Sequence, residues 1–250
     1  MITTQTLQGH WHRAWLKSQA FCDTETTVHW MQCGPLYVDV RIPPNRPDTR
    51  GATALADLPD AALLSLLRAE GFAGVVELNA DVCTWQRLIN WHGRPEQEDS
   101  GQLEFRGSDQ LMETGVLGDY AELWNRRSDH PASAVHMMAG SADAYLVTIG
   151  RRFVFGVGLA EAENSRNMIA ALEAGQRTWA LQQQFGNAFA FGCWDGAHGI
   201  AELSTNPLIE GQPVLSCTGD GELVWHAVDF FGQPRDVPLT RPVEVLNDVA

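Results

Sequence analysis

The chain lacks the sequence features of several large protein classes. No apolar run approaches the roughly 18 residues that a membrane span needs, and the first residues do not join a basic start to an apolar run. The five cysteines are an odd number without CxxC spacing, which fits neither a disulfide framework nor a structural zinc site. We therefore expect a protein of the reducing cytoplasm that is neither exported nor membrane-spanning.

Positive charge is also scarce. The chain has 17 Lys and Arg against 31 Asp and Glu, giving a formal net charge of −14, and its pI is about 4.8. Nucleic acids and anionic membranes both attract a basic surface, so neither is an expected partner.

Two catalytic signatures are missing. There is no Gly-x-Ser-x-Gly motif, and the run from Gly156 to Glu161 lacks the third glycine of the GxGxxG dinucleotide fingerprint. The sequence therefore gives no indication of a serine nucleophile or a bound nucleotide, and we expect no cofactor.

The composition is that of a folded protein, with 44% hydrophobic and 19% charged residues. Its 250 residues are enough for one large domain or two of about 125. Trp is unusually frequent, with nine against three Tyr, and most of the nine precede residue 130. A pocket lined with aromatic rings is therefore expected in the N-terminal half.

Short segments with strand-like alternation dominate the chain. In the first half they cover residues 9–17, 26–32, 36–42, 74–78, 81–91, 101–106, 110–113 and 119–126. Leucines at helical spacing between Pro59 and Gly71 predict one helix over residues 58–70. Short Gly- and Asp-bearing turns between the strands favour an antiparallel meander.

After residue 131 the pattern starts again. A hairpin over residues 144–158 is followed by a helix over 164–174 and by Thr178-Trp179, as Thr84-Trp85 follows the first helix. The repeated order of hairpin, helix and Thr-Trp strand predicts an internal duplication. The predicted fold is all-β with one short helix per half, arranged as two tandem antiparallel β-barrels over residues 1–128 and 129–250. A single β-sandwich or larger barrel is the alternative.

Gly9-His10-Trp11 resembles the Gly-x-Trp signature of lipocalins and other calycins, in which the Trp closes one end of the barrel. The wider text, including TTVHWMQCGPLYVDVRIP, CTWQRLINWHG, SGQLEF and METGVLGDYAELW, is similar to uncharacterised proteins in which two lipocalin-like barrels are joined in one chain. The resemblance covers most of residues 9–126 and is fainter beyond. It implies two lipocalin-like barrels with a cavity, and it implies no activity.

Four extended runs place aromatic rings beside charges on one strand face. They are Trp11-Arg13-Trp15, Tyr37-Asp39-Arg41, Trp85-Arg87-Ile89-Trp91 and Tyr120-Glu122-Trp124. We expect the third run to face a barrel lumen because its opposite face is polar. The second is expected to face solvent because its opposite face, Val38-Val40-Ile42, is wholly aliphatic.

These runs supply the candidate binding residues. The predicted function is binding of a small aromatic or anionic molecule, since a surplus of guanidinium groups suits a carboxylate. The expected ligand-binding side chains are Trp11, Arg13, Arg41, Trp85, Arg87, Trp91 and Trp124.

The alternative function is a lyase, isomerase or hydrolase without an organic cofactor. Its candidate acids and bases are Glu113, Glu122, Tyr120 and His92, which would have to gather in the same cavity.

Two further hypotheses concern a metal site and a docking surface. His10, His12 and His29 could together hold a divalent metal, but no acidic ligand is tied to them by spacing, and we expect no metal. A second barrel that is poorer in Trp could serve as a docking or dimerisation surface, which makes a homodimer the alternative to a monomer.

Overall fold

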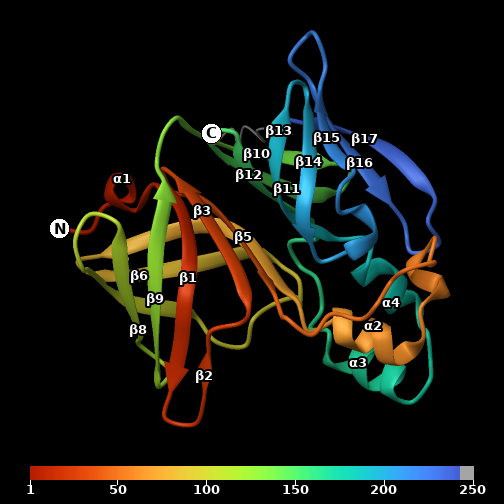
Figure 1. The fold of residues 1–250 in the computed structure, drawn as a ribbon, viewed down its shortest axis with the longest axis horizontal. Coiled ribbons are helices and arrows are strands. Elements are labelled where there is room, and N and C mark those ends of the chain that lie inside the picture. The colour runs from red at the N-terminus through yellow and green to blue at the C-terminus, as the bar shows by residue number, and fades with distance from the viewer. Residues whose placement is uncertain (243–250) are drawn as a thin grey trace, which may run out of the picture.

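The computed structural model describes residues 1–242 and consists mainly of two antiparallel β-barrels. Figure 1 shows the first barrel in red to yellow-green and the second in green to blue, with helices α2, α3 and α4 gathered beside the second. The predicted mostly-β, two-barrel fold is confirmed. No helix among the described residues is long and apolar enough to cross a membrane.

The first barrel is a ring of eight strands closed by pairing of β1 with β9, and the two-residue strand β2 pairs with β1 alone. The strands are β1 (Gly9–Ser18), β2 (Cys22–Asp23), β3 (Thr27–Cys33), β4 (Leu36–Ile42), β5 (Glu70–Asn79), β6 (Val82–Asn90), β7 (Asp99–Phe105), β8 (Gln110–Gly115) and β9 (Tyr120–Ser128).

The second barrel is a closed ring of eight consecutive strands. They are β10 (Ala132–Ala139), β11 (Ala142–Ile149), β12 (Arg152–Gly158), β13 (Ala188–Asp195), β14 (His198–Ser204), β15 (Pro213–Cys217), β16 (Leu223–Val228) and β17 (Pro234–Thr240). The boundary expected after residue 128 falls in the connection between β9 and β10, and the last residues of the expected second domain, 243–250, lie outside the described residues.

Both rings have their long helical connection in the same place, between the third and fourth strands of the ring. In the first barrel it carries the 3-10 turn η1 (Leu55–Asp57) and α2 (Asp60–Leu66); in the second it carries α3 (Arg166–Glu173) and α4 (Trp179–Gln184). The remaining short elements are α1 (Thr4–Leu7) and η2 (Pro207–Ile209). The two halves thus share strand number, strand order and the position of this connection.

One element of the expected repeat is wrong. Trp179 does not begin a strand; it begins α4 and its side chain is 69% exposed. The residues that follow it, Ala-Leu-Gln-Gln-Gln, are all good helix formers, and their propensity outweighs the analogy with Thr84-Trp85 in β6.

One apolar cluster joins the two barrels, in addition to the cluster inside each. Val38, Val40 and Ile42 on the outer face of β4 belong to the same buried cluster as Val147 and Val154 of the second barrel. Both faces of β4 are therefore buried, and the prediction that Tyr37-Asp39-Arg41 faces solvent is wrong: Tyr37 is 0% and Asp39 2% exposed. The aliphatic face is covered by the second barrel, which leaves the polar face to line the lumen of the first.

Phe189 of β13 packs against backbone of both barrels. A Cβ atom added at Gly71 of β5 would lie 2.3 Å from the ring of Phe189, and one added at Gly156 of β12 would lie 2.6 Å from the same ring. Glycine at these two positions therefore lets the two sheets approach closely enough to enclose the ring.

Candidate functional site

Four large aromatic rings line the lumen of the first barrel: Trp30, Phe72, Trp85 and Trp124. The Trp30 ring meets the Trp124 ring edge-on with centroids 5.4 Å apart, and meets the Trp85 ring edge-on at 5.8 Å. Edge-to-face contacts of this kind fix the orientation of each ring. The lumen is therefore rigidly walled on these sides.

Trp11 occupies the end of the lumen that α1 covers. It is fully buried, stacks on Trp30 with centroids 5.8 Å apart, and donates its indole N–H to the Leu7 carbonyl at 2.8 Å. The Arg126 guanidinium lies 4.5 Å over the Trp11 ring and donates to the carbonyls of Gln8 and Thr6. This end of the first barrel is closed.

Every arginine in the lumen has a carboxylate partner. Arg13 donates to Glu122 at 2.8 Å and to Asp23 at 2.7 Å. Arg41 donates to Asp39 at 3.0 Å and lies 3.7 Å from Glu122.

The third lumen arginine is Arg87, whose side chain is as exposed as that of Arg41, at 17%. Arg87 pairs with Asp99 at 2.6 Å, and its guanidinium stacks 3.6 Å from the centroid of the Phe72 ring. The surplus of guanidinium groups expected from the sequence is absent, because Asp23, Asp99 and Glu113 also belong to the site.

Glu113 is a buried carboxyl group held by two neutral donors. It accepts the Tyr120 hydroxyl at 2.9 Å and the Trp124 indole N–H at 3.0 Å, and lies directly opposite Glu122 in the pairing of β8 with β9. Burial, and then the charge of Glu122, raise the pKa of Glu113 well above its usual range. Burial also raises the pKa of Glu122, against the opposing effect of Arg41 and Arg13. Both carboxyl groups of the pair are therefore harder to ionise than exposed ones, and only Glu122 has arginines in direct contact.

The remaining space in the lumen is small. About 10 Å³ is open to the centre of a water molecule, which is room for one water. Three buried polar atoms nearby have no hydrogen-bond partner among the described residues: Trp30 Nε1, the Tyr37 hydroxyl and Glu122 Oε2. A large organic molecule does not fit, and a small polar group does.

The barrel wall opens beside this space. β6 and β7 pair only from Val82 to Trp85, so residues 86–90 of β6 have no strand partner on that side in the described part of the chain. A surface pocket of about 280 Å³ lies there, lined by residues 85–87 and 94–99, and it shares Trp85 and Asp99 with the inner space. The Arg87–Asp99 pair, 17% and 20% exposed, lies where the two meet.

Most of the residues singled out from the sequence come together here. Arg13, Arg41, Trp85, Arg87 and Trp124 line the lumen. Glu113, Glu122 and Tyr120 gather beside them, and Trp11 closes one end.

Trp91 and His92 do not belong to this site. A bulge in the β5–β6 pairing makes Leu88 an extra residue, so the side chains after it change sides, and Trp91 packs between the barrels with its ring 5.8 Å from Phe185. His92 hydrogen-bonds Ser165 and the Ala69 carbonyl at 2.9 and 3.0 Å. Simple alternation could not reveal this change of face.

Several residues of the site were not predicted from the sequence. Asp99 ends the acidic stretch EQED and has the composition of a loop, while Asp23 lies in a strand of only two residues. Trp30 lacks a charged neighbour at the spacing that drew attention to the other rings, and Phe72 falls between the helix expected over residues 58–70 and the strand expected over 74–78. Arg126 was also not predicted. It lies on β9, directly opposite Trp11 of β1 in the strand pairing.

Two of the three histidines, His10 and His29, form a contact between the barrels, and His12 lies beside His29 with ring centroids 5.5 Å apart. His10 Nε2 lies 2.9 Å from His29 Nδ1, and the His29 ring stacks on Phe191 of the second barrel at 3.7 Å. Burial lowers the pKa of His10 to about 4 and that of His29 to about 2. Among residues 1–242, no group of three or more His, Cys, Asp and Glu side chains is arranged to hold a metal ion.

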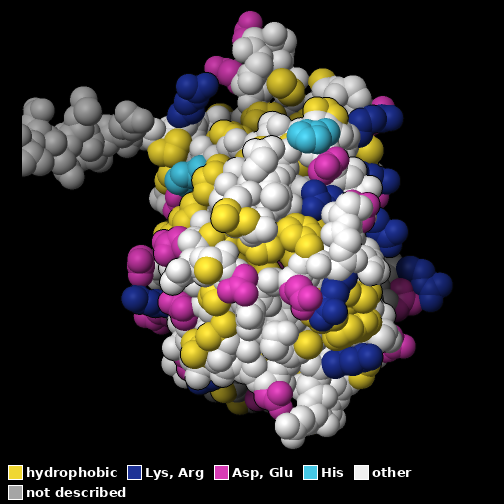
Figure 2. All heavy atoms as spheres, turned by 90° about the vertical axis from the view of Figure 1, so that its left-hand side faces the viewer, with side chains coloured by type: hydrophobic (Ala, Val, Ile, Leu, Met, Phe, Trp, Pro, Cys, Tyr) yellow, Lys and Arg dark blue, Asp and Glu magenta, His cyan; other side chains and the backbone are white. Residues whose placement is uncertain are grey.

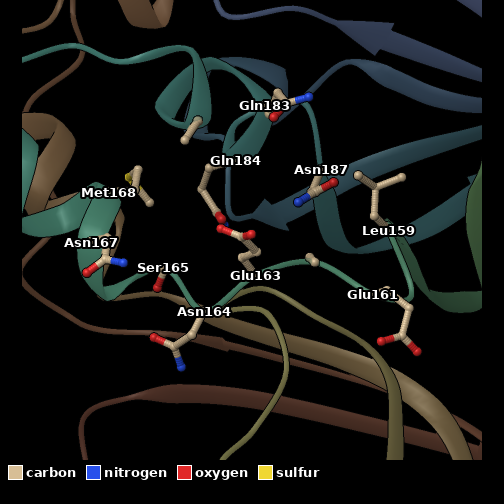
Figure 3. Close-up of a pocket in the computed structure, with 12 residues that line it drawn as sticks. Leu159, Glu161, Glu163, Asn164, Ser165, Asn167, Met168, Gln183, Gln184 and Asn187 are labelled. Carbon is tan, nitrogen blue, oxygen red and sulfur yellow. The ribbon is translucent and has the colours of Figure 1, made fainter.

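A second pocket, of about 330 Å³, lies where the connection from β12 to α3 faces α4 (Figure 3). Its polar lining is mainly amide and acidic, including Glu163, Asn167, Gln183 and Asn187. No sequence pattern predicted this pocket.

Figure 2 shows the side of the molecule formed by the first barrel, where basic side chains are scattered among acidic and apolar ones.

Comparison with known proteins supports the architecture alone. Neither a scan of protein-family models nor a search of curated proteins found a match. Among solved structures, the chain is similar to an uncharacterized protein, YLR301w, from Saccharomyces cerevisiae, with a TM-score of 0.51 and 12% identity over 92% of this chain and 97% of that one. At this identity the likeness shows a shared fold over nearly the whole length.

Proposed function

We propose that the first barrel binds a small molecule through a positively charged amine group. Five carboxyl groups, those of Asp23, Asp39, Asp99, Glu113 and Glu122, face the three guanidinium groups of Arg13, Arg41 and Arg87. The observation that carries the proposal is Glu113, a buried acid at the wall of the cavity that forms no ion pair with any described Lys, Arg or His. This charge balance favours a cation over the anion that the sequence alone favours.

The rings around Glu113 suit the same ligand. Trp30, Trp85 and Trp124 surround the inner space, and an ammonium group over an indole face gains about 0.5–2 kcal/mol. A cation beside Glu113 would also lower the pKa of its carboxyl group, so that amine binding releases a proton.

The size of the cavity sets how the ligand lies. The inner space accepts a group the size of one water molecule, so only the amine head enters it. The body of the ligand occupies the surface pocket between β6 and the connection to β7. This pocket meets the inner space at Trp85 and Asp99.

The test compares three ligands with one carbon skeleton: n-butylamine, n-butanol and n-butyrate. We expect quenching of Trp fluorescence and measurable heat of binding with the amine alone. A charge-assisted hydrogen bond contributes about 1.5–3 kcal/mol, so Glu113→Gln should weaken amine binding by about tenfold or more. The matched control is Glu77→Gln, an exposed position on the outside of β5. Tighter binding of butyrate, or an unchanged affinity in Glu113→Gln, would contradict the proposal.

A lipocalin-like architecture is part of the proposal. It is supported by Trp11, which lies at the closed end of the first barrel beneath Arg126, and by the antiparallel order of both rings.

The second candidate function is acid–base catalysis by the same carboxyl pair. The observation that favours it is the placement of Glu113, whose pKa is raised well above its usual range, directly opposite Glu122, which Arg13 and Arg41 contact. Such a pair supplies an acid and a base in one cavity. Exchange of the α-hydrogens of small ketones with D₂O, followed by NMR, tests it: Glu122→Gln should abolish exchange. Equal exchange rates in the variant and the parent protein would exclude this role.

A further inference from the structure

Three polar side chains on the outside of the second barrel form a hydrogen-bonded series across neighbouring strands. Ser216 Oγ on β15 lies 3.0 Å from His226 Nε2 on β16, and His226 Nδ1 lies 2.7 Å from Asp236 Oδ1 on β17. Trp225 and Ala227, which flank His226, belong to the apolar interior of the barrel, so His226 points outward. His226 and Asp236 are directly opposite each other in the strand pairing.

Hydrogen-bond chemistry fixes the position of the protons in this series. An ionised carboxylate only accepts, so Nδ1 of neutral His226 must carry the hydrogen that it donates to Asp236. Nε2 then has a free lone pair, and the Ser216 hydroxyl must donate to it. The serine proton therefore already points at a base, and the base is held in the required tautomer by an acid.

We propose that Ser216 is a nucleophile, activated by His226 and oriented by Asp236, that reacts with activated esters. Recognition of such a triad depends on these roles and not on a sequence motif, so the missing Gly-x-Ser-x-Gly motif is no objection. This activity is separate from the cavity of the first barrel and does not depend on it.

The reaction has two balanced halves. Ser216 Oγ attacks the ester carbonyl carbon as its proton passes to His226 Nε2; the bond from that carbon to the leaving oxygen breaks, and the departing alcohol takes the proton from His226. Water then attacks the acyl-serine, gives a proton to His226, and releases the carboxylic acid as Ser216 regains its proton.

The surroundings of Ser216 limit the rate and select the substrate. Two nearby backbone N–H groups are engaged, since Cys217 donates to the Ala197 carbonyl and Thr218 to the Glu222 carbonyl. Loss of one oxyanion donor slows known hydrolases by about 10²–10³-fold, so only esters with good leaving groups should react at a useful rate. His198, which lies opposite Ser216 on β14, is placed on the same face.

The exposure of Asp236 sets the expected size of its effect. Its side chain is 74% exposed and that of His226 is 31% exposed, so water screens the charge of the carboxylate. Asp236 therefore acts mainly by orienting the imidazole. Its removal should slow the reaction far less than the roughly 10⁴-fold seen where the triad acid is buried.

The test uses the full chain, a fluorophosphonate probe and p-nitrophenyl acetate. We expect one equivalent of probe on Ser216, located by peptide mass mapping, and slow release of p-nitrophenol. Ser216→Ala should abolish both signals. His226→Gln should slow labelling by about 100-fold, and Asp236→Asn by about tenfold.

The matched control is Ser133→Ala, an exposed serine of β10 in the same barrel, which should label like the parent protein. Circular dichroism spectra of all variants should coincide, because the substituted side chains lie on the outer surface. Absence of label on the parent protein, label that persists in Ser216→Ala, or an unchanged rate in His226→Gln would each overturn the proposal.

Discussion

The contact between His10 and His29 should make the stability of the protein depend on pH. His10 is buried and His29 half-buried between the barrels, and the pKa is about 4 for His10 and about 2 for His29, against about 6.5 in an unfolded chain. Above pH 6.5 both states of the protein carry neutral imidazoles. As the pH falls below 6.5 the unfolded state takes up protons that the folded state does not, so folding stability is lost with acidity.

The magnitude follows from these values. Between pH 8 and pH 5 a group that shifts from about 6.5 to about 4 contributes a loss of about 2 kcal/mol to the free energy of unfolding, and His29 alone would contribute about the same. The two shifts are not independent, because the charge of His10 is one cause of the low pKa of His29. We therefore expect a total loss of about 2–4 kcal/mol.

Urea unfolding at pH 8 and pH 5 measures this loss. The double variant His10→Gln, His29→Gln serves as the reference, because contributions from other groups cancel in the difference. Among these other groups are Glu113 and Glu122. Their pKa values are raised in the folded state, so they increase folding stability as the pH falls, opposite to the two histidines. His198→Gln, at an exposed histidine, should behave like the parent protein. Equal losses in the parent protein and the double variant would refute the reasoning.

Two further predictions concern the interface between the two barrels. Gly71→Ala places a methyl group 2.3 Å from the Phe189 ring and should destabilise the protein by about 1–3 kcal/mol in urea unfolding, whereas Gly219→Ala, which meets no atom within 4 Å, should change stability by less than about 0.5 kcal/mol. Deletion of residues 129–250 uncovers the aliphatic face of β4 and should give aggregates in light scattering; a monodisperse, folded product would show that the first barrel stands alone.

Local patterns were sufficient to predict much of the fold. Strand alternation and turn residues located the strands of the first barrel, because a pleated strand imposes a period of two wherever its two faces meet different surroundings. The same rule failed for β4, where both faces are buried and the polar one is inside. Which face of β4 turns inward depends on the second barrel, which covers the aliphatic face. The sequence of the strand alone does not show that this barrel is there.

The candidate site was predictable in part for similar reasons. Arg87 and Trp85 were found because they alternate on one strand, but their partner Asp99 comes from a stretch with loop composition. Trp91 was misplaced because one bulged residue, Leu88, reverses the sides of a strand. Ion pairs and bulges depend on contacts across strands, so the charge balance of the lumen became visible only in the structure.

The second barrel provides an internal comparison for the charges of the first. Both rings have eight strands and the same helical connection, yet the central cluster of the second barrel is apolar. Among the described residues, the buried acidic and basic side chains of Arg13, Asp39, Glu113 and Glu122 all belong to the first. Buried ion pairs are often no more stabilising than apolar side chains of similar volume.

Folding alone therefore does not require these charges, because a ring of the same topology closes around an apolar interior. Within residues 1–242, Trp30 Nε1, the Tyr37 hydroxyl and Glu122 Oε2 have no hydrogen-bond partner, and each such group costs about 1–3 kcal/mol when buried. In the amine-binding proposal, a ligand group would satisfy these charges and unpartnered polar atoms. The same atoms in a barrel that served only as a scaffold would have no such compensation.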